Sequence, residues 1–173
     1  MNPGATPAEK LCLACGLCCD GTLFKDVELQ AGDSARHLQS LHPALTIRNK
    51  KFPQPCAALC ADKRCAIYAD RPARCRSFEC ALFQSVAAGT TTPGAARRII
   101  RAARQRADKV RRLLRSLGDA DEHLALSLRF KRQRRRFDVV APDKTSAKVF
   151  AELTLAVHEL NLLLARKFYP DPV

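Results

Sequence analysis

Tryptophan is absent from the sequence, methionine occurs once and tyrosine twice, so aromatic surfaces for stacking on bases or sugars are scarce. No apolar segment approaches the ~20 residues of a membrane-spanning helix. The longest candidate, 153–165, is interrupted by His158, Glu159 and Asn161. Residues 1–10 lack the apolar stretch of a secretory signal. We therefore expect a cytoplasmic protein without integral membrane association.

Common catalytic motifs are missing as well. The sequence has no Walker loop, Rossmann glycine fingerprint, nucleophile elbow or HExxH motif. A nucleophilic pair of Cys60 with His42 is conceivable, but no pattern places the two residues together. These absences favour a binding protein over an enzyme.

Cysteine is abundant but confined to one part of the chain. All nine cysteines lie between residues 12 and 80, and none follows Cys80. The odd number, the adjacent pair Cys18–Cys19 and the missing export signal argue against a disulfide scaffold. Since the cytosol is reducing, a metal site is the better interpretation.

Positive charge is concentrated in the middle of the chain. Residues 95–136 carry fifteen basic and four acidic groups, whereas 1–94 carry eleven and eight and 137–173 carry four and five. We expect a cysteine-cluster metal-binding domain at 1–86, a linker at 87–94, and a basic helical bundle at 95–173 packed on it as one compact unit.

Local patterns in the cysteine-rich half predict little regular structure. Residues 22–30 alternate apolar and polar residues as a short strand does, and Asp33–Ser34 can cap a helix reaching about His42. Asp70 and Pro72 signal a helix start. Beyond them, one helical face would carry Cys75, Phe78, Leu82 and Phe83.

The pattern of the second half predicts three amphipathic helices. The first follows an apolar stripe from Ala96 to Leu117 and stops at Gly118. The second is predicted to begin near Asp121–Glu122 and the third at Thr145 or Ser146. The expected fold is mainly α with a short strand or two, a metal-stapled N-terminal half packed on an antiparallel helical bundle.

The first cysteine array, C-x2-C-x2-C-C at residues 12–19, has metal-ligand spacing. Two-residue gaps let successive thiolates converge on one ion. Consecutive side chains usually diverge, so one of Cys18 and Cys19 is expected to serve a second metal or to bridge.

A second block, Cys56, Cys60, Cys65, Cys75 and Cys80, supplies further thiols. Two tetrathiolate metals would use eight cysteines and leave one over, whereas shared sulfurs or a single four-cysteine centre would change that count. The histidines His37 and His42 are unnecessary as ligands beside nine cysteines.

The segments CLACGLCC at 12–19, PC at 55–56 and CAIYADRPARCRSF at 65–78, with Cys80, resemble the CxxCxxCC (YkgJ-type) cysteine-cluster proteins, described as zinc- or iron-chelating. The resemblance covers about 12–83. It implies metal ligands at Cys12, Cys15, Cys18, Cys19, Cys56, Cys65, Cys75 and Cys80. Cys60 lies outside the family pattern and is the candidate for the spare thiol or for an extra ligand.

Soft thiolates suit zinc, copper(I) and iron–sulfur clusters. The first array matches three ligands of a ferredoxin run and departs at the fourth, although a 4Fe-4S cluster could take its fourth ligand from the second block. We favour Zn²⁺ slightly over iron. Tyr68 and Arg71 are expected to donate hydrogen bonds to the sulfurs or to lock the loop to the helix. Arg74 and Arg76 flank Cys75, and cations there would lower the pKa of its thiol.

The basic segment supports an alternative function. Its arginines could neutralise phosphates in salt-dependent nucleic-acid binding, and an acidic protein is another partner of matching charge. The candidate residues are Arg97, Arg98, Arg101, Arg104, Arg112, Arg132, Arg134 and Arg135. The favoured interpretation is that these arginines form a solvent-exposed face without a binding role. The sequence thus predicts a metal-binding protein with a structural or metal-handling role, and a nucleic-acid-binding module with a structural metal as the alternative.

Overall fold

The computed structural model describes residues 6–169, which form seven helices and one two-stranded antiparallel sheet. The elements are α1 (Pro7–Cys15), β1 (Asp26–Glu28), α2 (Ala35–Leu41), β2 (Lys51–Pro53), α3 (Ala73–Ser77), α4 (Ala81–Ala87), α5 (Pro93–Ser116), α6 (Leu126–Val139) and α7 (Lys144–Lys167). The mainly helical fold predicted from the sequence is confirmed. No helix within 6–169 combines the length and apolar character needed to cross a membrane.

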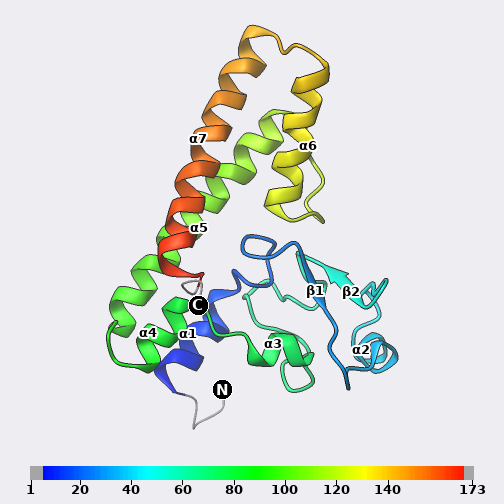
Figure 1. Ribbon diagram of the computed structural model, residues 1–173, viewed down its shortest axis with the longest axis vertical. Helices are drawn as coiled ribbons and strands as arrows, with labels where there is room; N and C mark the ends of the chain where they lie inside the picture. Colours follow the sequence, from blue (N-terminus) through cyan, green and yellow to red (C-terminus); the bar gives the residue numbers. More distant parts are fainter. Residues whose placement is uncertain (1–5, 170–173) are drawn as a thin grey trace.

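The long helices α5 and α7 pack along each other, and α6 packs against the C-terminal part of α5 (Figure 1). Thr92 caps α5 by accepting a hydrogen bond from the amide of Ala95, with Pro93 in the first turn. Asp143 caps α7 in the same way. The buried stripe of α5 is Ala96, Ile100, Ala103, Ala107, Val110 and Leu114. Its regular spacing makes this pair the scaffold of the molecule.

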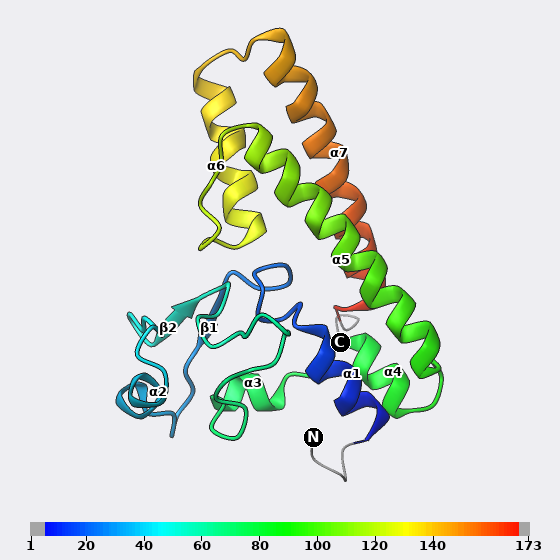
Figure 2. The same ribbon diagram turned by 180° about the vertical axis from the view of Figure 1, so that it is seen from behind.

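At the other end of α5, the short helices α1 and α4 complete the main hydrophobic cluster (Figure 2). Leu11 of α1, Leu82 of α4 and Phe168 after α7 are buried there. Leu17 and Leu23 of the cysteine-rich segment join the same cluster. Residues from both ends of the chain therefore share one core.

A second, smaller hydrophobic cluster lies under the two-stranded sheet. Val27 pairs with Phe52 in the register of β1 and β2, and both side chains are buried. The cluster consists of Val27, Leu29, Leu38, Leu45, Phe52, Ala58 and Ile67. Strands of three residues each contribute few hydrogen bonds, so side-chain burial is the main stabilising term in this part.

Several local predictions are confirmed. β1 falls inside the predicted strand at 22–30, Ser34 caps α2, and α5 follows the predicted stripe to Ser116. The third bundle helix begins at Lys144, one residue before the predicted start.

The predicted start of the second bundle helix is wrong, because α6 begins at Leu126 rather than near Asp121–Glu122. The acidic side chains before it are used differently. Asp119 accepts hydrogen bonds from Arg129 and Arg132, and Asp121 accepts one from Arg132. They anchor the side of α6 instead of capping its first turn.

The predicted single helical face from Cys75 to Phe83 is also wrong, since the chain leaves the helix between α3 and α4. Phe78 is extended and packs edge-on against Phe24, with ring centroids 4.9 Å apart. Cys80 then becomes the N-cap of α4, accepting a hydrogen bond from the amide of Phe83. The break places Cys75 and Cys80 on two separate helices.

Candidate metal centre

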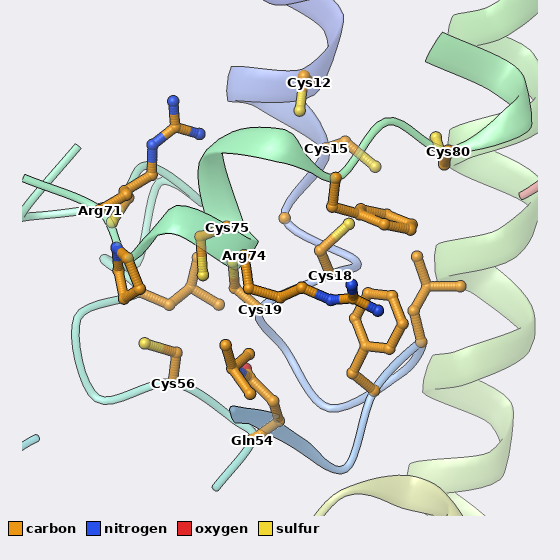
Figure 3. Close-up of a pocket in the computed structure, with 18 of the residues that line it drawn as sticks. Cys12, Cys15, Cys18, Cys19, Gln54, Cys56, Arg71, Arg74, Cys75 and Cys80 are labelled. Atoms are coloured by element: carbon orange, nitrogen blue, oxygen red, sulfur yellow. The ribbon is translucent and has the colours of Figure 1, made fainter. Parts of the chain in front are cut away.

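A cavity of about 430 Å³ opens between α1, α3, α4 and the chain around β2. Eight of the nine cysteines line it, and Figure 3 shows most of them. They are Cys12, Cys15, Cys18, Cys19, Cys56, Cys65, Cys75 and Cys80. Cys60 is exposed and does not belong to the lining, and all nine thiols are free.

The first four cysteines reach the cavity through the end of α1. Cys12 and Cys15 lie about one turn apart on this helix, which ends at Gly16 with a φ of 68°. This left-handed conformation suits glycine. The amides of Cys19 and Asp20 both donate to the Gly16 carbonyl at 3.0 Å, which closes a tight turn carrying Cys18 and Cys19.

The second block is brought to the first by backbone hydrogen bonds. The amide of Cys56 donates to the carbonyl of Cys19 at 2.7 Å. The loop between Cys56 and Cys65 folds back, because the amide of Ala66 donates to the carbonyl of Ala58 at 2.8 Å. α3 then supplies Cys75 to the same cavity.

Burial dominates the acidity of the cavity thiols. It raises the pKa of Cys15 and of Cys75 to about 12, and the pKa of Cys18 and Cys19 also lies well above the usual value. Neighbouring thiols add to the effect, since each disfavours a second negative charge. In the absence of a cation, the cavity thus favours protonated thiols.

The predicted lowering of the pKa of Cys75 by its flanking arginines is wrong. Burial, Cys56 and Cys65 raise the pKa of this thiol, and the positive charge of Arg71 only partly opposes them. Arg74 is exposed at the cavity edge, while Arg76 donates to the carbonyl of Arg71. Arg71 is therefore the cation that acts on Cys75.

Backbone amides also act on the sulfurs. The amide of Phe83 donates to Cys80 Sγ at 3.4 Å. Hydrogen bonds from the amides of Leu17, Ala58 and Ile67 likewise oppose the rise in pKa of Cys15, Cys56 and Cys65. Amide donors stabilise the thiolate, the form that binds metal.

With the side chains as they stand, no three Cys, His, Asp or Glu groups within residues 6–169 lie close enough to hold one ion. The chemistry of the donor set fits a thiophilic metal nevertheless, because free thiols from α1, α3 and two loops face one cavity. Zinc binds sulfur at ~2.3 Å. Holding it here requires rotation of cysteine side chains toward a common point.

The remaining predicted site residues have defined places. Arg71 Nε donates to the Tyr68 carbonyl at 2.9 Å, and its guanidinium stacks over the Tyr68 ring at 3.6 Å, so the pair braces the loop that precedes α3. His37 forms an exposed 3.7 Å pair with Asp70. Neither His37 nor His42 lines the cavity.

Sequence reasoning missed Gln54 altogether and predicted Arg104 only as a phosphate-binding residue. Gln54 lines the cavity with 1% of its surface exposed, and its amide oxygen has no hydrogen-bond partner in the part of the chain that the structure describes. Arg104 of α5 donates to the carbonyls of Ala14 and Cys15. A lone glutamine carries no motif, and Arg104 is indistinguishable in sequence from the solvated arginines around it.

The predicted phosphate-binding arginines divide into two groups. Arg104 and Arg132 are engaged with the protein itself. The other six are exposed and form no ion pair or side-chain hydrogen bond with residues 6–169: Arg97, Arg98, Arg101, Arg112, Arg134 and Arg135. They are distributed over α5 and α6.

Comparison with known proteins agrees with this site. The family model CxxCxxCC, described as "putative zinc- or iron-chelating domain", matches residues 11–105. Searches of curated proteins and of solved structures give no significant match. The matched segment covers more than half of the chain and contains all eight cavity cysteines, and on that basis the protein belongs to the CxxCxxCC family.

Proposed function

We propose that this protein binds zinc through the cavity cysteines and that the metal has a structural role. The observation that carries the proposal is the selective gathering of eight cysteines around one cavity while Cys60 stays outside. The wider assignment to metal binding is supported by the family, which is described as zinc- or iron-chelating. Bound zinc would supply a fixed tetrahedral crosslink without redox chemistry.

A structural role is supported by what surrounds the thiols. The cavity lies between the two hydrophobic clusters, and cysteines pack against both of them. The smaller cluster has only short elements above it, so a crosslink at its edge would contribute much of its stability. Metal storage or delivery would instead need readily exchangeable sites.

The test is metal analysis with an absorption spectrum on protein purified without oxygen and without an affinity-metal column. Zinc in a colourless sample is the expected result. A brown sample containing iron and labile sulfide would show that the cysteines hold an iron–sulfur centre instead of zinc. A metal-free protein that also fails to take up added zinc would contradict the proposal.

Nucleic-acid binding is the second candidate, supported by the six exposed arginines that form no ion pair with the described residues 6–169. Such binding should weaken steeply as salt rises, because phosphate contacts release counterions. Gel-shift titrations with an unspecific RNA and a DNA duplex, at low and physiological salt, test it. Affinity that is absent, or indifferent to salt, would exclude this candidate.

A further inference from the structure

Cys18 and Cys19 are adjacent in sequence but lie with different partners. In Figure 3, Cys18 lies with Cys15 and Cys80, whereas Cys19 lies on the side of Cys56 and Cys75. The turn closed on the Gly16 carbonyl carries both residues, and Figure 3 shows them on the sides of different partners. One ion is poorly placed to bind both.

The two hydrophobic clusters separate the cavity cysteines in the same way. Cys15, Cys18 and Cys80 pack against the main cluster. Cys56, Cys65 and Cys75 pack against the cluster under the sheet. Each hydrophobic cluster therefore brings three sulfurs to its own side of the cavity.

Local structure assigns the remaining two cysteines. Cys12 lies about one helical turn before Cys15 on α1, so it belongs with the first set. The carbonyl of Cys19 accepts the amide of Cys56 at 2.7 Å, which ties Cys19 to the second set. Both sets then contain four sulfurs.

We propose that the cavity holds two separate four-thiolate centres, the first formed by Cys12, Cys15, Cys18 and Cys80 and the second by Cys19, Cys56, Cys65 and Cys75. The inference rests on the proposed metal binding and adds its stoichiometry and ligand pairing. Cys18 and Cys19 are the point where the centres separate. Cys60 belongs to neither.

Charged groups are distributed over both centres. Arg104 acts on Cys15 of the first centre, and Arg71 acts on Cys12 of the first centre as well as on Cys65 and Cys75 of the second. These cations offset part of the formal −2 charge of a zinc tetrathiolate.

Cobalt(II) titration of the metal-stripped full-length protein tests the pairing, because cobalt reports tetrahedral thiolate ligation by its absorption. The wild type and the control Cys60→Ser should saturate at two equivalents. Cys18→Ser and Cys19→Ser should each retain one equivalent with an intact tetrathiolate spectrum. The double variant Cys18→Ser/Cys19→Ser should bind no cobalt with a tetrathiolate spectrum.

A second variant for each centre guards against local misfolding. Cys80→Ser should behave like Cys18→Ser, and Cys56→Ser like Cys19→Ser, while circular dichroism monitors the long helices. The double variant Cys80→Ser/Cys56→Ser removes one ligand from each centre and should therefore lose both equivalents of cobalt. The proposal of two separate centres would be overturned if the wild type saturated at one equivalent of cobalt, or if a single variant lost both equivalents. Either result would still be consistent with metal binding. A wild type that binds no cobalt would contradict the proposed function itself.

Discussion

At the scale of single residues, Asp119 carries a buried charge outside the cysteine cavity. Its carboxylate pairs with Arg129, whose side chain is 2% exposed, at 3.0 Å and with Arg132 at 2.9 Å. Asp119→Asn leaves Arg129 buried without its counter-ion and should lower the free energy of unfolding by about 3 kcal/mol. Denaturant unfolding measures this. The control Glu122→Gln removes an exposed pair with Arg115 and should cost less than about 1 kcal/mol.

The same carboxylate gives the protein an acid-sensitive contact. Burial raises the pKa of Asp119, but hydrogen bonds from Arg132 and the charge of Arg129 outweigh it, so its pKa lies below the ordinary value. A lowered pKa means that the folded chain binds the proton less readily than the unfolded chain. The stabilisation is present above the ordinary carboxyl pKa and is lost as pH falls through the lowered one. The pH dependence of unfolding below about pH 4 should therefore be shallower in Asp119→Asn than in the wild type.

Gly21 combines a special conformation with a close approach. Its φ is +78°, and an added Cβ would lie 3.0 Å from the Ala125 Cα and 3.2 Å from Pro55. Gly21→Ala should therefore cost more than the ~1–2 kcal/mol of the left-handed conformation alone. Gly89→Ala is the matched control, because Gly89 has a φ of +73° and open space around it. Equal losses in thermal unfolding for both variants would show that the contact with Ala125 is unimportant.

At the scale of elements, α5 holds the first cysteine array in place. Arg111 donates to the carbonyl and carboxylate of Asp20 and to the Thr22 hydroxyl, directly after Cys19. Arg111→Gln should lower the free energy of unfolding by about 2 kcal/mol, because it removes charge-assisted hydrogen bonds in a half-buried site. It should also weaken cobalt binding. Arg112→Gln, at an exposed position, should change neither by more than about 0.5 kcal/mol. If the two variants behave alike, α5 does not position the array.

Periodic elements were predictable from sequence, and the cysteine partners were not. The stripes of α5 and α7 repeat over many turns, so their burial follows from spacing alone. The break at Phe78 depends on contact with Phe24, which lies more than fifty residues earlier in the chain. The same applies to Asp119, whose partners lie on the next helix. Spacing suggested that Cys18 and Cys19 diverge, but the placement of the second block relative to them depends on tertiary packing.

At the scale of the whole molecule, the two hydrophobic clusters differ in how much structure supports them. The main cluster is enclosed by α1, α4, α5 and α7, whereas the smaller one is covered by short strands, α2 and loops. If metal crosslinks the cavity between them, removing it should loosen the smaller cluster and spare the long helices.

Hydrogen exchange before and after chelation of the full chain measures this difference. Amides around Phe52 and Ile67 should exchange much faster in the chelated protein, because their cluster loses its crosslink. Amides around Val110 and Leu153 should keep most of their protection, since α5 and α7 pack on each other without any cysteine between them. Restoring zinc should reverse the change. Uniform protection in both states would mean that the packing of the sheet and loops suffices without metal, and the metal would then have to be a cargo rather than a structural element.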